Sequence, residues 1–288
     1  MHRSRRHFLQ TSALLSMGGL ISSSKLFASK ERKKEIAFGI QLWSVRDDMG
    51  KDAASVLKQL SGYGYKQIES CDLGKTIFWG MKPLEFKKHL DDLGLSMPSA
   101  HCDISKNFEQ TAADAASVGA KYLICPWLGP QKSIDDYKKA ADNFNAKGEI
   151  CKKNGLRFAY HNHDYSFKIT DGELPQNVMM KFSDPTLVDF EMDMYWVVTA
   201  GQDPIQWIQN NKNRFKLCHI KDRSKNVDAA NKDASCNLGT GAIDFKTILP
   251  IAKKCGMEYF HVEQEKWEDS TPMKSAEANA VYMKGVKV

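Results

Sequence analysis

The sequence predicts an α/β protein folded as a single (β/α)8 TIM barrel. Eight short apolar segments, each suited to a β-strand, alternate with longer polar and amphipathic segments suited to helices. Strict alternation of strands and helices is typical of a parallel sheet, and eight repeats in about 250 residues are typical of a sheet that closes into a barrel. We expect the strands at residues 36–43, 66–69, 96–101, 122–125, 156–161, 187–193, 215–219 and 258–263.

The segments between the expected strands carry helix signals. The first helical pattern covers residues 53–60 and ends near Gly62. Later helical segments end at glycines, which readily adopt the left-handed conformation at a helix C-terminus. These glycines are Gly94, Gly119, Gly155 and Gly256. No stretch rich in Pro, Gly or Ser divides the chain, so we expect residues 29–288 to form one domain.

Residues 1–28 resemble a twin-arginine signal peptide. Arg5 and Arg6 precede a short apolar run around residues 13–21 and then several small residues. The apolar run is shorter than the roughly 20 residues needed to span a bilayer, and no cysteine near the expected cleavage point provides a lipid anchor. We therefore expect a periplasmic protein without a membrane anchor. Because this route exports folded proteins, a cofactor or metal ion can be loaded before export.

The charge balance argues against a nucleic-acid partner. The whole chain has a net charge of +6, from 41 basic and 35 acidic residues. Residues 1–28 hold four of the basic residues and no acidic one, so the expected mature chain is close to neutral. Binding to nucleic acid needs clustered excess positive charge.

The seven cysteines are scattered and form no Cys-x-x-Cys pair. An odd number without paired spacing is not typical of a disulfide framework or a zinc–thiolate site. We expect buried free thiols.

Ionisable residues lie at or just after the ends of most expected strands. In a barrel of this kind the active site lies at the carboxyl ends of the strands. Buried ionisable groups are costly unless they are paired or bind a cation, so their convergence favours a metal site. The residues are Glu69, His101, His161 with His163, Asp193, His219 and Glu263.

The ligand types indicate one divalent metal ion without identifying it. Imidazole and carboxylate ligands suit Mn, Co, Fe, Zn or Mg. His161 and His163 are two residues apart on a strand, so we expect both to face the interior, one binding metal and the other moving a proton. Lys221 either stabilises an oxyanion or is a solvated surface lysine.

Five motifs make the mature chain resemble the xylose isomerase-like barrel superfamily. They are Tyr-His-Asn-His-Asp at 160–164, Asp-Met-Tyr-Trp at 193–196, Cys-His-Ile-Lys-Asp at 218–222, Gly-Thr-Gly-Ala-Ile-Asp at 239–244 and Val-Glu-Gln at 262–264. The superfamily includes sugar isomerases, ketose epimerases, inosose dehydratase and endonuclease IV proteins. The resemblance implies a metal held by Asp193, His219 and Glu263, with His161 or His163 from strand five; His161 is our assignment.

Strand five departs from the epimerase pattern, in which a glutamate stands where this chain has His161-Asn162-His163. The epimerases exchange protons with two glutamates on opposite faces of the substrate, so the change favours a lyase or hydratase. The expected reaction is proton abstraction beside the carbonyl of an unphosphorylated keto-sugar or 3-keto-glycoside, followed by loss or addition of a group at the β carbon. His163 or Glu263 acts as the base. Lys221 or His101 supports the oxyanion or the leaving group.

Three alternatives remain open at this stage. The first is a sugar isomerase or epimerase that acts on a free ketose through the same enediolate. The others are an endonuclease IV-like nuclease and a non-catalytic sugar-binding protein. A homo-oligomer is also possible.

Substrate contacts are expected from residues near the strand ends. Tryptophans can stack on a sugar ring or pack in the core. The expected set is Trp43, Glu69, Trp127, Asn162 and Trp196. Gly239-x-Gly241 either cradles a phosphate or forms a turn before a helix capped by Asp244, and we favour the turn.

Overall fold

A computed structural model describes residues 36–74, 76–228, 230–267 and 270–287. Eight parallel strands form a closed barrel in the order β1-β10-β7-β6-β5-β4-β3-β2. They are β1 (Gly39–Gln41), β2 (Gln67–Cys71), β3 (Ser96–His101), β4 (Tyr122–Cys125), β5 (Arg157–His161), β6 (Val188–Asp193), β7 (Phe215–Ile220) and β10 (Tyr259–Val262). The expected (β/α)8 TIM barrel is confirmed. The expected signal peptide at 1–28 lies outside the described residues.

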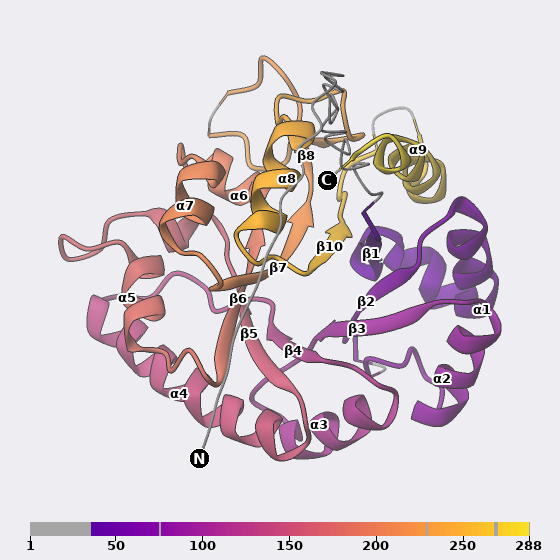
Figure 1. Cartoon of the computed structure of the whole chain (residues 1–288), viewed down its shortest axis with the longest axis horizontal. Coiled ribbons are helices and arrows are strands. Elements are labelled where there is room, and N and C mark those ends of the chain that lie inside the picture. Colours follow the sequence, from indigo (N-terminus) through magenta and orange to yellow (C-terminus); the bar gives the residue numbers. More distant parts are fainter. Residues whose placement is uncertain (1–35, 75, 229, 268–269, 288) are drawn as a thin grey trace, which may run out of the picture. The chain divides into compact units, whose positions relative to one another are not determined.

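Helices surround the barrel, as Figure 1 shows for the run from α1 to α5. They are α1 (Arg46–Tyr63), α2 (Pro83–Asp92), α3 (Phe108–Ser117), α4 (Ile134–Lys153), α5 (Pro175–Phe182), α6 (Met194–Thr199), α7 (Pro204–Asn210), α8 (Phe245–Lys254) and α9 (Pro272–Lys284). Short 3-10 helices follow β1 and β5, at η1 (Leu42–Val45) and η2 (Asp164–Phe167). In the described part of the chain, no helix combines the length and the apolar character that crossing a bilayer requires.

The first expected strand is shorter than its apolar run predicts. β1 ends at Gln41, whose side-chain oxygen accepts a hydrogen bond from the backbone N–H of Trp43 at 3.1 Å. This cap starts η1, so Trp43 leaves the strand. The chain continues directly into α1, which begins seven residues before the expected helix. The helix ends at Tyr63, close to the expected Gly62, and Gly64 is its C-cap.

The other expected helix ends are confirmed. The four glycines named from the sequence have positive φ angles between 65° and 98°. Five of the cysteines are buried free thiols, as expected: Cys71, Cys102, Cys125, Cys151 and Cys218.

The amino ends of the strands close the barrel with apolar side chains. Tyr122, Ile124, Ala159 and Leu217 form a small buried cluster there. One charged pair accompanies this cluster: Arg157 at the start of β5 donates to Asp189 on β6, and the Tyr122 hydroxyl donates to the same carboxylate at 3.1 Å. This layer is the floor below the polar residues at the opposite end.

A two-stranded hairpin interrupts the path from β7 to α8. It consists of β8 (Asp222–Arg223) and β9 (Ser235–Cys236), which pair antiparallel. The hairpin follows Lys221 directly, so it places a loop beside the carboxyl ends of β7 and β10.

Candidate metal centre and cavity

A cavity of about 630 Å³ opens at the carboxyl ends of the strands. Eight of the twelve residues expected at the site line it: Trp43, His101, Trp127, His161, His163, Trp196, Lys221 and Glu263. The other four, Glu69, Asn162, Asp193 and His219, are fully buried, each with 0% of its surface exposed.

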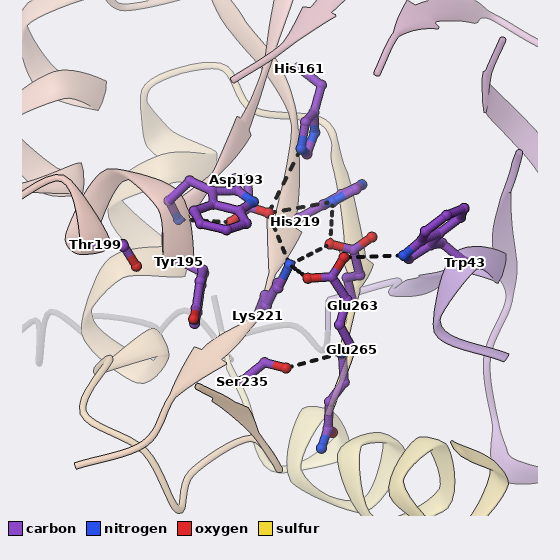
Figure 2. A network of polar contacts seen from close by, with 12 residues as sticks. Trp43, His161, Asp193, Tyr195, Thr199, His219, Lys221, Ser235, Glu263 and Glu265 are labelled. Carbon is purple, nitrogen blue, oxygen red and sulfur yellow. Dashed lines mark hydrogen bonds and ion pairs between the residues drawn. The ribbon is translucent and has the colours of Figure 1, made fainter. Parts of the chain in front are cut away.

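Asp193 lies at the centre of the expected metal ligands (Figure 2). Its Oδ2 is 3.8 Å from Nε2 of His161 and 3.9 Å from Nδ1 of His219. Nδ1 of His219 is in turn 3.2 Å from Oε2 of Glu263. The four side chains come from β5, β6, β7 and the residue after β10, so the closed barrel brings them together.

The donor set fits a divalent cation. Among the described residues, Oδ2 of Asp193 has no hydrogen-bond partner although it is buried. A buried carboxylate oxygen without a partner is costly unless a cation or water satisfies it. Asp193, His219 and Glu263 place their ligand atoms within 4.8 Å of one another, all three buried. Two imidazoles and two carboxylates are ligands that Zn²⁺ and similar ions accept.

A second layer of carboxylates lies below the first. Glu191 on β6 is fully buried and lies 2.7 Å from Nε2 of His101 and 2.9 Å from Nδ1 of His161. Glu69 on β2 lies 2.6 Å from Nε2 of His219. His101, His161, Glu191 and His219 make up a further buried group that could hold a metal ion.

Glu191 was not among the residues expected from the sequence. The signal for it is the alternation along β6, where Asp189, Glu191 and Asp193 share one face and apolar residues occupy the other. The last residue of β6, Asp193, was expected at the site, but the carboxylate of Glu191 two positions earlier lies on the same face. The same period of two places the buried His261 below Glu263 on β10.

The crowding of charges shifts the pKa values of the carboxylic acids in opposite directions. Burial raises the pKa of Asp193 to about 7 despite the nearby Lys221 charge. Burial and then the Glu69 charge raise the pKa of Glu191 to about 7. Burial alone would raise the pKa of Glu263 too, but Lys221 and His219 hold it below its ordinary value. Glu263 is therefore the most firmly ionised of these three groups.

The histidines also separate into two kinds. Burial disfavours the charged form of His101, but Glu69 and Glu191 outweigh it and raise its pKa to about 9. Burial, followed by the charge of Lys221, lowers the pKa of His163 to about 3. One histidine that lines the cavity therefore carries a charge at neutral pH, while another does not.

Lys221 is not a surface lysine, because only 1% of it is exposed. Its Nζ is 3.2 Å from Oε2 of Glu263 and 3.9 Å from Oδ2 of Asp193, and it also donates to Glu265. Burial opposes the charge, but Glu263, Asp193 and Glu265 together raise the pKa of Lys221 above its ordinary value. It is therefore a fixed positive charge in the cavity wall.

Glu265 is a second residue that the sequence did not reveal. Besides binding Lys221, it accepts a hydrogen bond from the indole N–H of Trp43 at 3.1 Å (Figure 2). The Arg46 guanidinium lies 4.5 Å from the centre of the Trp43 ring. Glu265 therefore fixes the indole N–H of Trp43 and Arg46 lies against its ring, so the position of Trp43 in the cavity wall is well defined.

His163 lies among aromatic rings instead of in the metal cluster. Its ring centre is 4.5 Å from that of Trp127 and 5.2 Å from that of Trp196, and it stacks on Tyr165. Because β5 ends at His161, the following turn decides where His163 points. Trp127 is 58% exposed and lines the cavity, which suits it for contact with a ligand.

Two of the expected substrate contacts do not line the cavity. Asn162 bonds the backbone of Asp193 through both its amide nitrogen and its oxygen, each at 3.2 Å, and ties β5 to β6. Glu69 accepts hydrogen bonds from Gln41 at 2.7 Å and Ser99 at 2.5 Å. Neither lines the cavity, so both support residues that do.

The Gly239–Gly241 segment is a turn, as favoured from the sequence. Its backbone N–H groups at Gly239 and Gly241 donate to Oδ2 of Asp222, at 2.9 and 3.0 Å. A side chain at Gly241 would approach Oδ1 of Asp222 to 2.2 Å, so the close contact requires glycine. Asp244 caps α8 by accepting from the N–H of Thr247. The groups that would have cradled a phosphate are already used.

A family model described as "Xylose isomerase-like TIM barrel" matches residues 57–285. The chain belongs to this family. The motif-based resemblance is therefore confirmed at the level of the family, and the match covers every barrel strand except β1.

Curated members of the xylose isomerase-like family are similar to this chain. An inosose dehydratase of Geobacillus thermodenitrificans is 24% identical over 279 residues, covering 82% of this chain and 91% of the relative. An inosose dehydratase of Clostridium perfringens is 28% identical over 145 residues, covering 46% of this chain. In the latter case the chain spans about half the length of its relative, 48%.

Solved structures of the family show the same barrel. A sugar phosphate isomerase/epimerase from Parabacteroides distasonis is 29% identical with a TM-score of 0.76, covering 93% of this chain and 100% of that one. The IOLI protein with a bound zinc atom is 15% identical with a TM-score of 0.72, covering 87% of this chain and 98% of that one.

Proposed function

We propose that the protein is a divalent-metal-dependent lyase or hydratase that acts on an unphosphorylated keto-sugar or 3-keto-glycoside. The observation that carries the proposal is the buried, unpartnered Oδ2 of Asp193, surrounded by nitrogens of His161 and His219 at 3.8 and 3.9 Å. The inosose dehydratase relatives, which are named for an elimination reaction, support the same class.

His161, Asp193, His219 and Glu263 would hold the metal. When bound, a divalent ion polarises a ketone and stabilises the negative charge that develops on its oxygen. The identity of the ion stays open among Mn, Co, Fe, Zn and Mg. His163 does not belong to this set, because it lies among aromatic rings, so it is available for proton transfer.

In the proposed reaction a base removes the proton from the carbon beside the ketone. His163 lines the cavity and is uncharged at neutral pH, so it is the proposed base, and Glu263 is the alternative. The electron pair of the broken C–H bond moves to the ketone oxygen, where the Lys221 ammonium lies ready to stabilise the charge. The enediolate then expels the β substituent, and protonated His101 supplies a proton to the leaving group.

The substrate class follows from the walls of the cavity. Trp43, Trp127 and Trp196 line it, and aromatic faces suit the apolar faces of sugar rings. The Gly239 and Gly241 N–H groups are bonded to Asp222, which removes the phosphate cradle considered from the sequence. An unphosphorylated substrate also agrees with the proposed export to the periplasm.

A sugar isomerase or epimerase acting on a free ketose is the second candidate. The similarity to the Parabacteroides distasonis sugar phosphate isomerase/epimerase, at 29% identity, favours it. Both reactions begin with the same deprotonation and differ only in the fate of the enediolate.

The test is a screen of metal-loaded protein against keto-glycosides and free ketoses in deuterated water, followed by NMR. The proposal expects an unsaturated or hydrated sugar with release of the aglycone, and loss of the reaction when a chelator removes the metal. Clean conversion between two ketoses, with no elimination or hydration of any keto-sugar, would establish the second candidate instead. Turnover that is unchanged by complete metal removal would contradict both.

A further inference from the structure

We infer that Glu69 and Glu191 are positioning residues that decide which ring nitrogen of His219 and of His161 faces the metal. The inference deepens the proposed function and rests on its metal site. Both carboxylates are 0% exposed and do not line the cavity, so they act on a ligand only through the histidines they bind.

His161 is oriented by Glu191. Its Nδ1 lies 2.9 Å from Oε2 of Glu191, while its Nε2 points to Oδ2 of Asp193 at 3.8 Å. When Glu191 is ionised its oxygen can only accept, and Nδ1 then carries the hydrogen of the neutral ring. Nε2 then presents its lone pair toward Asp193.

His219 is oriented in the opposite sense by Glu69. Here Nε2 lies 2.6 Å from Oε1 of Glu69, and Nδ1 is 3.2 Å from Glu263 and 3.9 Å from Asp193. By the same reasoning Nε2 carries a hydrogen, which leaves Nδ1 as the nitrogen that can give up its hydrogen and offer a lone pair to a metal ion. The two histidines thus present different nitrogens to one point. Glu191 also lies behind His219, at 3.4 Å from its Nε2.

The two carboxylates are themselves held in place. Gln41 and Ser99 donate to Glu69, at 2.7 and 2.5 Å. Nε2 of His101 lies 2.7 Å from Glu191 and 3.2 Å from Glu69, so one imidazole spans both. Contacts from β1 and β3 therefore fix the acceptors on β2 and β6. A carboxylate behind a metal-binding imidazole restricts its rotation and raises its basicity, and its loss typically weakens metal binding 10- to 100-fold.

A rival arrangement uses the same side chains. His101, His161, Glu191 and His219 form a buried group that could itself hold an ion, through the inward nitrogens of His161 and His219. In that case Glu191 would be a ligand and Asp193 would not. The two arrangements predict opposite ring nitrogens for the metal and opposite responses to substitution.

The experiment measures Co²⁺ binding to the full-length protein by competition with a chelator. We expect Glu69→Gln and Glu191→Gln each to weaken Co²⁺ binding about 10- to 100-fold, and Asp193→Asn to abolish it. Asp189→Asn is the matched control, because it removes a buried carboxylate two residues earlier on β6 that binds Arg157 instead of a histidine. It should leave Co²⁺ affinity unchanged.

A second measurement needs no variant to fold. In metal-free protein labelled with ¹⁵N-histidine, NMR should find a hydrogen on Nδ1 of His161 and a hydrogen on Nε2 of His219. In the Co²⁺-loaded protein, two shifted imidazole N–H signals should disappear in deuterated water.

The outcomes separate this inference from the function it rests on. Unchanged Co²⁺ affinity in both glutamine variants, or the opposite hydrogen placement on both rings, would overturn the positioning role and leave the metal site standing. Binding that survives Asp193→Asn but is lost in Glu191→Gln would establish the deeper site. No Co²⁺ binding by the unaltered protein would overturn the proposed function together with this inference.

Discussion

The two ends of the barrel interior are built from the same strands but from opposite chemistry. At the amino ends, Tyr122, Ile124 and Leu217 pack in an apolar cluster, beside the Arg157–Asp189 pair. At the carboxyl ends, buried carboxylates and imidazoles crowd together, and Oδ2 of Asp193 and Oε1 of Glu191 are without hydrogen-bond partners in the described residues. On β6, acidic residues lie along the whole of one face, at Asp189, Glu191 and Asp193.

This difference in composition shows which end of the barrel stabilises the fold and which end carries the reactive groups. An apolar layer lowers the free energy of the folded state through burial and packing. Buried charges lower it much less, since desolvation offsets their attraction. A site that contributes so little stability is typical of a functional site, as expected for the carboxyl end of a (β/α)8 TIM barrel. Changes at the two ends should therefore affect different measurements.

The largest effect is expected from the metal ligands. Changing Asp193, His219 or Glu263 to Ala removes one of the converging donors, so bound metal and activity should both be lost while the barrel stays folded. Metal analysis and circular dichroism of the three variants check this. Full metal occupancy in two of them would show that the ligands have been assigned wrongly.

Next comes the proposed base. His163→Ala should slow deuterium exchange beside the ketone by a factor on the order of 10²–10⁴, the contribution of a positioned base. Metal content should not change, because His163 lies outside the ligand cluster. NMR exchange rates and metal analysis measure the two quantities. Loss of metal equal to that of Asp193→Ala would place His163 among the ligands.

A change in the apolar cluster should lower stability more than it weakens metal binding. Ile124 is fully buried on β4, so Ile124→Ala should lower the free energy of unfolding by about 2–5 kcal/mol. Ile124→Val is the milder control, at about 0.5–1.5 kcal/mol. Denaturant unfolding and metal titration test the separation. If Ile124→Val weakened metal binding, the two ends would not be independent.

The smallest effect is a pH dependence of the metal-free protein. The folded-state pKa of Asp193, about 7, lies above its ordinary value, so the folded protein binds more protons than the unfolded chain between about pH 4 and 7. Stability therefore falls as pH rises through this window. Lys221, Glu263 and His219 face the group, and their charges shift its pKa.

Asp193→Asn isolates this contribution. Relative to that variant, chelator-treated protein should lose roughly 1–3 kcal/mol of unfolding free energy between pH 4 and pH 8, since one pKa unit corresponds to about 1.4 kcal/mol. Parallel denaturation curves across the range measure it. A difference that stays constant between pH 4 and pH 8 would mean that Asp193 is ionised throughout.

Local pattern was sufficient to predict the strands. Every strand end lies within three residues of its expected position, and the largest difference is at β1, where Gln41 caps a 3-10 helix. Hydrophobic alternation and glycine stops are properties of neighbouring residues, so they can be read without knowing the fold. The convergence of residues at the strand ends follows from closure of the barrel alone.

The contacts within the site were beyond local pattern. The two-residue spacing predicted that His161 and His163 face the same way. In the structure His161 lies near Asp193, whereas His163 lies near Trp196, because β5 ends at His161. Asn162 turned to the neighbouring backbone, and Glu265 reached Trp43 across more than two hundred residues.

The sequence by itself determined the barrel, its eight strands and the end at which ionisable residues gather. Only the tertiary structure decided that Glu191 and Glu69 lie behind His161 and His219, and that Lys221 is buried between carboxylates. The physical reason is that periodicity specifies the face on which a side chain lies. Its partner depends on the register between strands and on the path of each loop, and both are set by packing of the whole chain.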